Sequence, residues 1–179
     1  MQPPVERTLL YLNNDTVTAI YDTIIDSSII INAIGNKALL KKCEIGNNVI
    51  IIDNNAFYNC ANLTSVTIGN SVTTIDNAAF SGCSSLTSIN IPNSVTSING
   101  NVFYGCSGLT SITVDSNNQT YDSRNNCNAI IETNSNKLIS GCQTTVIPNT
   151  VTIIGDFAFY YCSSLTSINI PDSVTSIGN

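Results

Sequence analysis

The sequence predicts a β-rich solenoid, a right-handed stack of short coils with a parallel β-sheet on one face, short helical or 3₁₀ turns opposite, and one inserted β-hairpin. Three observations lead to this fold class. The same apolar residue types recur at a period of 23 positions, each copy contains one short run of alternating β-branched residues, and one longer copy interrupts the period. A fixed period of this length indicates coils stacked on one another, with the same side-chain type at each level.

Seven apolar positions define each copy of the repeat. In the copy that organises the chain they are Val72, Ile75, Phe80, Cys83, Leu86, Ile89 and Ile91. The set returns one period later from Val95, is present one period earlier from Val49, and reappears after a break from Val151. We therefore expect equivalent side chains of successive copies to pack directly on one another. The phenylalanines should form a buried, stacked column: Phe57, Phe80, Phe103 and Phe159.

Each copy reads as a strand, a turn, a second short extended segment and a compact turn. The Leu-Thr-Ser-Val-Thr-Ile run alternates in polarity, so Val66 and Ile68 should point inward, and Ser65 and Thr67 outward. A Gly-Asn-Ser or Pro-Asn-Ser sequence then forms a turn. Val72–Ile75 is the second extended segment. Phenylalanine and cysteine follow three positions apart, which is the spacing of one helical or 3₁₀ turn.

We expect residues 1–179 to form one solenoid. Its parts are an atypical N-terminal cap (1–25), a degenerate repeat (26–48), the regular repeats (49–114), an irregular repeat (115–147), and a regular repeat followed by a truncated last one (148–179). The step from Ile91 to Ile147 spans one regular copy and one longer copy, and the extra residues of the longer copy predict a hairpin at 128–140 with the three-residue loop 134–136. The sequence stops early in another copy, so we expect further repeats or self-association through an uncapped end.

The outward strand residues form the candidate partner-binding face. With strands about 4.8 Å apart, five or six levels present a flat polar sheet on the order of 25 Å long. Tight binding normally uses a few aromatic or arginine anchors, so we expect weak affinity per repeat and a gain through many contacts. The alternative is a solubilising surface with no partner. The two columns are Ser65, Ser88, Ser111 and Ser167, and Thr67, Asn90, Thr113 and Asn169.

Tyrosine follows the repeat phenylalanine in three copies, at Tyr58, Tyr104 and Tyr160, and Tyr161 comes directly after the last of these. We expect these rings to be exposed on the outer side of the array, where amphipathic tyrosine is common in recognition. An incidental surface position is the favoured account of these rings, and a role in recognition is the alternative.

Composition argues against several classes of partner. The formal net charge is −6 and charged residues make up 10% of the chain, whereas nucleic-acid backbones and anionic membranes attract clustered lysine and arginine. No apolar run is long enough for a membrane span, so we expect no membrane insertion. The N-terminus lacks the basic start and apolar core of a secretory signal, so an exported protein would carry its signal outside this sequence.

The cysteines read mainly as packing residues. Four of them share the slot three positions after phenylalanine, which predicts small, buried, unpaired thiols: Cys60, Cys83, Cys106 and Cys162. Cys127 and Cys142 lie in the irregular repeat, and they are the one pair for which a disulfide stays open. Lys37 occupies the cysteine slot of the degenerate repeat, so that coil should be distorted or locally open.

No catalytic, metal or cofactor site is predicted, and we do not expect an enzyme. The chain has no histidine and no Cys-x-x-Cys pair. Asp53, Asp76 and Asp156 stand at the same point of their copies, and we interpret them as turn-forming carboxylates rather than paired catalytic acids. The polar run 115–122 is rich in oxygen ligands but lacks the glycine and glutamate of an EF-hand loop, so a polar loop is favoured over calcium binding.

The repeat unit I-P-x-S-V-T-x-I-x-x-x-[AV]-F-x-x-C-x-x-L-T-S-I-x-I resembles the BspA-like leucine-rich repeats of the treponeme type. Two instances are IPNSVTSINGNVFYGCSGLTSITV at 91–114 and VTIIGDFAFYYCSSLTSINIP at 151–171. The resemblance covers 49–114 and 147–179 closely and 26–48 loosely. It implies a leucine-rich repeat solenoid. It also implies a bacterial or protist protein that is secreted or held at the cell surface, and that acts in non-catalytic recognition or adhesion toward host matrix proteins or other cells. The alternative function is a passive structural spacer that carries another domain.

Overall fold

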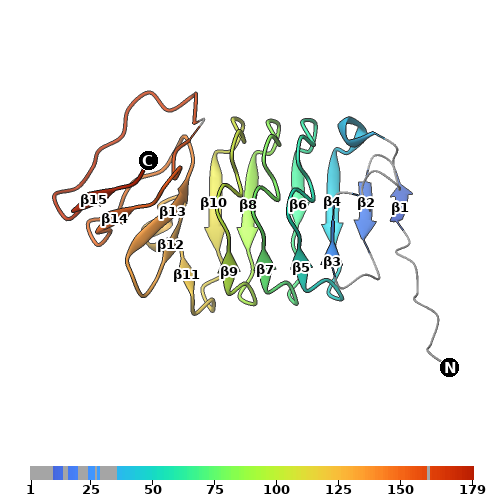
Figure 1. Ribbon diagram of the computed structural model, residues 1–179, viewed down its shortest axis with the longest axis horizontal. Helices are drawn as coiled ribbons and strands as arrows, with labels where there is room; N and C mark the ends of the chain where they lie inside the picture. Colours follow the sequence, from blue (N-terminus) through green and yellow to red (C-terminus); the bar gives the residue numbers. More distant parts are fainter. Residues whose placement is uncertain (1–9, 14–15, 20–23, 27, 29–35, 161) are drawn as a thin grey trace.

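The chain winds into an elongated stack of coils (Figure 1). The structure is a computed structural model, and it describes residues 10–13, 16–19, 24–26, 28, 36–160 and 162–179. Two sheets built from parallel coils run along the stack, and a third sheet follows them. This arrangement confirms the predicted β-rich solenoid with a parallel sheet on one face.

The first sheet contains the strands predicted from the alternating runs. Its order is β1 (Leu10–Asn13), β2 (Thr16–Ala19), β4 (Lys42–Ile45), β6 (Ser65–Thr67), β8 (Ser88–Ile91) and β10 (Ser111–Val114). β1 and β2 are antiparallel, and every later pair is parallel. Ser65 pairs with Ser88, and Ser88 pairs with Ser111, so the register of the sheet equals the period of the sequence.

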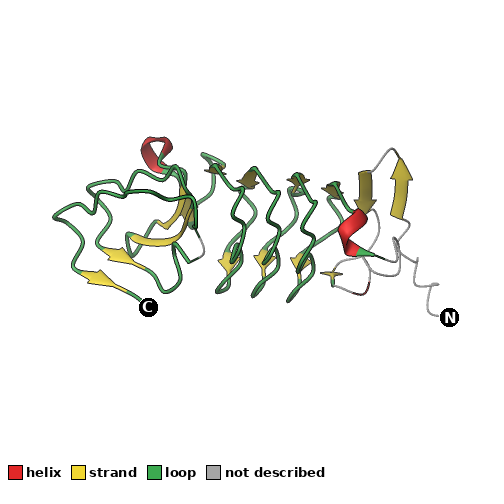
Figure 2. Cartoon of the chain, turned by 90° about the horizontal axis from the view of Figure 1, so that it is seen from above, coloured by secondary structure: helices red, strands yellow, loops and turns green. Residues whose placement is uncertain are grey.

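The second sheet follows the other extended segment of each coil. It consists of β3 (Ile24–Ile25), β5 (Ile51–Ile52), β7 (Thr74–Ile75) and β9 (Ser97–Ile98), and all its pairs are parallel. Figure 2 shows the first and second sheets on two different sides of the stack. Ile25, Ile52 and Ile75 are fully buried, so this sheet closes a second wall of the core.

The phenylalanine turns close each regular coil with hydrogen bonds between residues three apart. The Tyr58 N–H donates to the Asn55 carbonyl at 3.0 Å, and the Cys60 N–H donates to the Phe57 carbonyl at 3.0 Å. This is the single 3₁₀-type turn that the Phe-Cys spacing predicts. In the described part of the chain, 3₁₀ helix proper is limited to η1 (Lys37–Leu39) and η2 (Arg124–Asn126), and no helix is long and apolar enough to cross a membrane.

The first core cluster is built around the phenylalanine column. Phe57 and Phe80 stack with their ring centres 5.0 Å apart and an interplanar angle of 10°, and Phe80 and Phe103 stack at 5.8 Å and 7°. Phe57 and Phe80 are fully buried, and Phe103 is 7% exposed. The rings meet face to face because the parallel register places equivalent residues directly above one another.

The irregular repeat leaves both sheets and starts a third. The order of this sheet is β11 (Tyr121–Asp122), β12 (Ala129–Glu132), β13 (Lys137–Gly141), β14 (Ile153–Ile154) and β15 (Ser176–Ile177). β12 and β13 are antiparallel, which is the predicted hairpin. Glu132 pairs with Lys137, so the loop is 133–136, one residue longer than predicted.

The hairpin divides the core into two clusters. Ile130 packs in the first cluster, with the phenylalanine column. Its neighbours on β12, Ala129 and Ile131, pack in a second cluster that includes Leu138 and Val151. Successive side chains of a strand point to opposite faces, so one strand serves both clusters. We call the part of the chain from 127 onward, which contains the second cluster, the C-terminal block.

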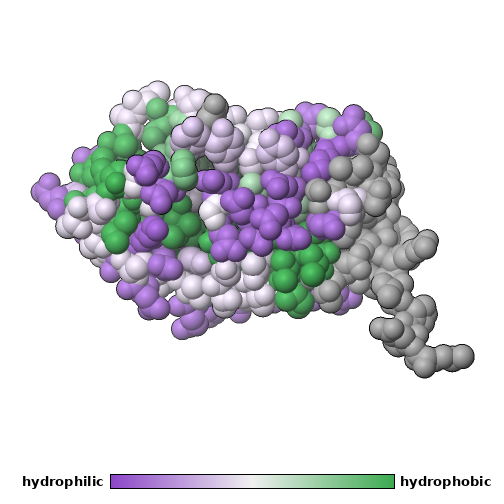
Figure 3. All heavy atoms as spheres, viewed as in Figure 1, coloured by the Kyte–Doolittle hydropathy of each residue, from purple (hydrophilic) through white to green (hydrophobic). Residues whose placement is uncertain are grey.

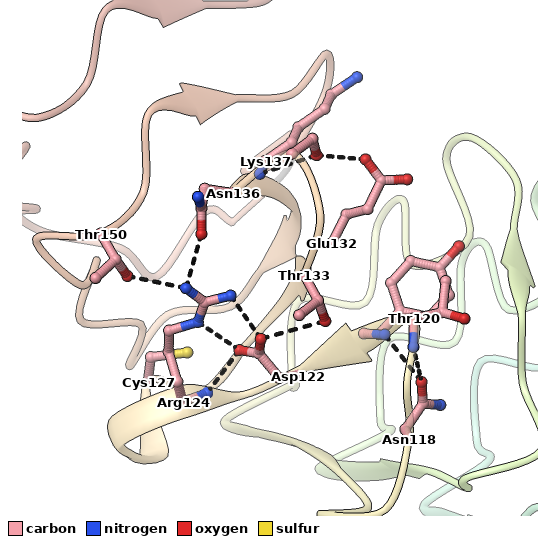
Figure 4. A network of polar contacts seen from close by, with 12 residues as sticks. Asn118, Thr120, Asp122, Arg124, Cys127, Glu132, Thr133, Asn136, Lys137 and Thr150 are labelled. Carbon is pink, nitrogen blue, oxygen red and sulfur yellow. Dashed lines mark hydrogen bonds and ion pairs between the residues drawn. The ribbon is translucent and has the colours of Figure 1, made fainter.

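A polar network ties the irregular repeat to this block (Figure 4). Arg124 Nη2 lies 2.6 Å from Asp122 Oδ2, and Nη1 donates to Asn136 Oδ1 at 2.8 Å and to Thr150 Oγ1 at 3.2 Å. Burial of the Asp122 carboxyl raises its pKa, but the hydrogen bonds and charge of Arg124 outweigh burial and hold this pKa below its usual value. One guanidinium thus connects β11, the hairpin loop and the coil that follows.

Two predictions about the last regular repeat are wrong. Phe159 does not continue the phenylalanine column: it is half-buried and packs against the second cluster, where a Cβ added at Gly141 would clash with its ring. The run 165–170, predicted as a strand, forms none, and Ile170 is 46% exposed. A parallel strand needs a hydrogen-bonding neighbour, and the preceding irregular coil places its strands in the third sheet instead of the first.

Candidate functional site

The outer face of the six-stranded sheet carries most of the predicted partner-binding residues. On β8 and β10 the outward side chains lie in register, and the Thr113 hydroxyl donates to Asn90 Oδ1 at 2.9 Å. This face therefore consists of short hydroxyl and amide side chains in aligned columns. Its members are the exposed Thr67, Ser88, Asn90 and Thr113 and the half-buried Ser65 and Ser111.

Ser167 and Asn169 do not lie on this face. Both are exposed, but they belong to the run that forms no strand, and the first sheet ends at β10. Two hydroxyls close the edge of β10 where the next strand was expected. The Thr144 hydroxyl donates to the Thr110 carbonyl, and Ser123 Oγ accepts from the Val114 N–H at 3.0 Å.

Lys42 and Glu44 extend the two columns onto β4. Lys42 is aligned with Ser65 and Glu44 with Thr67, and both charged residues are exposed. The sequence held a signal for this pair, because Cys43 lies one period before Val66 and takes its buried place. The polar face thus carries one residue of each charge at its N-terminal end.

The repeat carboxylates cap turns. Asp53 Oδ1 accepts from the Asn54 N–H at 2.7 Å, and Asp76 Oδ1 accepts from the Asn77 N–H at 2.8 Å. Asn99 Nδ2 donates to the same Asp76 oxygen at 2.9 Å. These contacts are those of turn-forming carboxylates. Within the described ranges, no group of three or more His, Cys, Asp or Glu side chains is placed to hold a metal ion.

The oxygen-rich run 115–122 uses its side chains for its own turns. Asp115 Oδ1 accepts from the backbone N–H of Asn117 at 2.8 Å. Asn118 is buried, and its Oδ1 accepts from the N–H groups of Thr120 and Tyr121, both at 2.9 Å (Figure 4). These bonds agree with the polar-loop interpretation that was favoured over calcium binding.

Three thiols of the repeat slot, those of Cys83, Cys106 and Cys162, donate to the previous coil, and all four thiols of the slot except the half-buried Cys162 are buried. Cys83 Sγ donates to the Phe57 carbonyl at 3.2 Å, and Cys106 Sγ donates to the Phe80 carbonyl at 3.1 Å. Burial raises the pKa of Cys60 to about 11 and the pKa of Cys106 to about 12. Such thiols stay protonated at neutral pH and are poor nucleophiles.

Cys127 and Cys142 are not joined. Both are buried, and all seven cysteines of the chain are free thiols. Cys142 belongs to the first core cluster and Cys127 to the second, so the hairpin separates them. The sequence could not place the two residues on different sides of β12, because alternation along that strand is a property of the folded core.

Lys37 is a structural donor at the start of the regular coils. Its coil forms η1 in place of the regular turn. The ammonium Nζ lies 3.3 Å from the Asn55 carbonyl, 3.4 Å from the Ala56 carbonyl and 3.3 Å from the Tyr58 carbonyl. The residue in the cysteine slot therefore bonds the next coil, whereas the cysteines bond the previous one.

A cleft of about 290 Å³ opens between the regular coils and the C-terminal block. Its apolar lining includes Val102, Phe103, Leu109 and Ile139. Its polar lining includes Asn99, Asn101, Gln143, Lys137 and Asp156, so one residue of each charge faces it. On the side of the molecule seen in Figure 3, hydrophobic residues gather over the C-terminal block, while the middle of the stack is mostly hydrophilic.

Three aromatic side chains flank the cleft. Tyr104 and Tyr160 stack at 5.2 Å with an interplanar angle of 24°, and Phe157 meets Tyr160 edge to face at 5.4 Å. The predicted exposure of the repeat tyrosines is confirmed at Tyr58 (43%), Tyr104 (37%) and Tyr160 (47%), and Tyr161 lies outside the described residues. The sequence interpretation missed Phe157, although it stands where other copies have asparagine or alanine.

A comparison with protein families matches a model described as a BspA type leucine rich repeat region. The match comprises six copies and covers residues 27–140 and 131–179. A search of curated proteins gives no match.

Three solved structures illustrate the likeness in fold. The pneumococcal vaccine antigen PcpA has a TM-score of 0.70 at 20% identity, over 78% of this chain and 36% of that one. A leucine-rich repeat protein of T. pallidum has a TM-score of 0.51 at 17% identity, over 98% of this chain and 85% of that one. A leucine-rich repeat protein from Bacteroides ovatus has a TM-score of 0.51 at 20% identity, over 97% and 54%. At these identities the likeness concerns the fold alone, and this chain spans little more than a third of the pneumococcal antigen.

Proposed function

Because this chain belongs to the BspA-type leucine-rich repeat family, we propose that it is a non-catalytic module for protein recognition or adhesion, at a cell surface or after secretion. The outer face of the six-stranded sheet is its proposed partner-binding surface. The family and fold are those of protein-interaction scaffolds. The likeness in fold to a vaccine antigen supports a location accessible from outside the cell.

The observation that carries this proposal is the in-register column of short polar side chains on β6, β8 and β10. Short hydroxyl and amide groups on a rigid sheet offer hydrogen bonds at little cost in side-chain entropy. The same face holds no aromatic or arginine anchor among Ser65, Ser88, Asn90 and Ser111, so contacts at several levels must act together.

The test places charges on this face without loading the sheet with like charges. A fourfold variant carries Ser88→Glu, Ser111→Lys, Asn90→Lys and Thr113→Glu, so that residues paired across β8 and β10 have opposite signs. Binding to immobilised, purified extracellular matrix proteins is measured by biosensor. We expect the response to at least one of them to fall by about tenfold or more, with an unchanged melting temperature.

The matched control carries Thr74→Glu and Ser97→Lys, which pair across β7 and β9 on the second sheet. This control should bind like the original protein. Equal binding by the fourfold variant would refute the strand face as the binding surface, and a lack of binding to every matrix protein would refute adhesion to matrix.

The second candidate is a passive spacer, and the extended shape favours it. β1 and β15 lie at opposite ends of the stack (Figure 1). A spacer tolerates the fourfold variant but depends on length, so deletion of one whole copy (residues 72–94) would alter its behaviour while the charge variant would not.

A further inference from the structure

A ladder of backbone hydrogen bonds joins the phenylalanine turns of successive coils. In each turn three alternate N–H groups donate to carbonyls of the next coil. The first set is Asn55 to Asn77 at 3.1 Å, Phe57 to Ala79 at 2.7 Å and Asn59 to Ser81 at 2.8 Å. The second set is Ala78 to Gly100 at 3.3 Å, Phe80 to Val102 at 3.0 Å and Gly82 to Tyr104 at 2.7 Å.

The ladder ends at the third turn. Asn101, Phe103 and Gly105 are the equivalent donors, one period after the second set, and Asn101 and Gly105 have the same left-handed backbone (φ 59° and 72°) as their counterparts. Within the described residues, none of these three N–H groups has an acceptor. Asn101 and Phe103 line the cleft. Phe103 is 7% exposed, and a buried N–H without a partner is rare in folded proteins.

At the opposite end of the ladder, a side chain takes the place of a preceding coil. The Lys37 ammonium bonds the carbonyls of Ala56 and Tyr58, which are the equivalents of the ladder acceptors Ala79 and Ser81, and it also lies within bonding distance of the Asn55 carbonyl. No side chain of the described residues plays the corresponding acceptor role at Asn101, Phe103 and Gly105. The fold therefore closes one end of the ladder and leaves donors at the other, at the cleft.

The phenylalanine column ends at the same place. Phe103 stacks on Phe80 at 5.8 Å, and no further ring of the described residues stacks on it, because Phe159 packs against the second cluster instead. The cleft thus combines one side of an aromatic ring with a row of backbone donors. Each regular turn uses these same two features to bind the turn of the next coil.

Phe157 supports a binding role for the cleft. It has a φ of 57°, in the left-handed region, as do its equivalents Asn55, Ala78 and Asn101. Asparagine tolerates this conformation, whereas an aromatic residue rarely adopts it. Phe157 is also 45% exposed, so burial does not explain the choice. Backbone strain at an exposed aromatic residue beside a cleft is typical of a ligand-contacting position.

We propose that the cleft binds a peptide segment of a partner protein that carries an aromatic side chain and takes the shape of the phenylalanine turn of a next coil. Peptide carbonyls accept from the N–H groups of Asn101, Phe103 and Gly105, and the aromatic ring stacks on Phe103 with Phe157 and Tyr160 at the rim. Lys137 and Asp156 balance in charge, so the segment is uncharged near the ring. The proposal deepens the proposed function and rests on it, but it concerns a surface separate from the strand face.

The apolar floor selects this ligand over a saccharide. Val102, Phe103, Leu109 and Ile139 form the apolar part of the cleft lining, and a sugar bound against them would bring its hydroxyl groups close to apolar side chains. Desolvating those hydroxyls against apolar side chains is unfavourable. An aromatic side chain has no hydroxyl groups to desolvate in this way, except in tyrosine, and it leaves the peptide backbone to accept from the N–H row.

The test uses selective ¹⁵N labelling of phenylalanine, which gives five backbone signals. The probe is a synthetic peptide of residues 76–85 of this chain with Cys83→Ser, which carries the turn that naturally follows a coil. The control peptide adds Phe80→Ala. We expect the first peptide to shift the Phe103 signal in a saturable way and to leave Phe57 unmoved. The control peptide should bind about tenfold more weakly.

Amide hydrogen exchange gives an independent reading. In the peptide-free protein, Phe103 should exchange at least about tenfold faster than Phe57 and Phe80, because only the latter two donate within the ladder. Peptide should slow exchange at Phe103. Equal protection of all three amides without peptide, or no saturable shift of Phe103 up to about 5 mM peptide, would overturn the proposal.

A variant separates this site from the fold and from the strand face. Phe157→Asn restores the residue found at Asn55 and Asn101, so we expect an unchanged or higher melting temperature together with about three- to tenfold weaker peptide binding. Undiminished peptide binding by this variant would contradict the rim role. The fourfold strand-face variant should keep full peptide binding, so loss of matrix binding and loss of peptide binding report on the two surfaces separately.

Discussion

Replacement of Phe80 by alanine removes the middle ring of the phenylalanine column. Phe80 is fully buried, and it stacks on Phe57 at 5.0 Å and on Phe103 at 5.8 Å. The coils on both sides are held by the ladder, so the structure cannot collapse into the space that the ring leaves. Phe80→Ala should therefore create a cavity and lose two stacking contacts at once.

The cost follows from these contacts. Truncation of a buried phenylalanine to alanine typically lowers the free energy of unfolding by about 3–5 kcal/mol. Each stacked aromatic pair stabilises the folded state by about 0.5–1.5 kcal/mol beyond the burial of its area. With rings on both faces, Phe80→Ala should lie at the upper end, at about 5 kcal/mol. Phe159→Ala is the matched control, because Phe159 is half-buried and outside the column. It should cost about 2 kcal/mol.

Guanidinium unfolding followed by far-ultraviolet circular dichroism measures both variants. The two variants are compared by their free energies of unfolding, provided that the slope of this free energy against denaturant concentration is the same for both. A changed slope would indicate a loss of cooperativity between coils. A cost below about 2 kcal/mol for Phe80→Ala, or an equal cost for Phe159→Ala, would refute the buried column as the main core of the regular coils.

Three further outcomes are expected. Lys37→Met removes the donor that closes the ladder, and it should cost about 1–3 kcal/mol in thermal unfolding, with Lys37→Arg closer to the original. The pKa of Asp122 is lowered in the folded state, so the ionised carboxylate stabilises the fold above the unfolded-state pKa, and this stabilisation is lost as the pH falls through the folded-state pKa. Arg124→Ala removes the cause of the lowered pKa, so it should make the free energy of unfolding fall less steeply between about pH 5 and pH 2. Burial raises the pKa of Cys60 and Cys106 to about 11 and about 12, so iodoacetamide at pH 8 should label them only after unfolding, as read by mass spectrometry; labelling in the folded protein would contradict their burial.

The regular coils show why the sequence period was informative. Ser65, Ser88 and Ser111 lie side by side, and Phe57 stacks on Phe80, because a parallel register with a shift of one period is the arrangement that buries every equivalent apolar residue together. The polar strand face follows directly, since alternation along a strand sends every second residue outward.

The last regular repeat shows where the same reasoning fails. Phe159 and Ser167 are the residue types expected at their repeat positions, but they do not have the structural environment of the equivalent residues in the other copies. Their positions depend on the preceding coil, and that coil contributes the β12–β13 hairpin to a third sheet. A repeat pattern specifies which side chains a coil offers for packing, while the neighbouring coil decides whether those side chains are packed.

The cleft could not be predicted from the pattern of side chains in the sequence. Its lining includes Asn101 and Phe103, whose backbone N–H groups have no acceptor among the described residues, and backbone groups are the same in every copy. Lys37 is similar, because its charge in a cysteine slot predicted a distorted coil but not the three carbonyls that it bonds. Phe157 was the residue of the cleft whose type differs from the asparagine or alanine at the equivalent repeat positions.

By itself, the sequence determined the solenoid, its parallel register, its phenylalanine column and its polar face, because each of these follows from one residue type repeated at one interval. Only the tertiary structure decided where the stack is interrupted, which cysteines face which cluster, and which donors meet the cleft. The physical reason is that hydrogen-bond ladders between coils join backbones, so the place where a ladder ends depends on the neighbouring coil and has no residue type of its own.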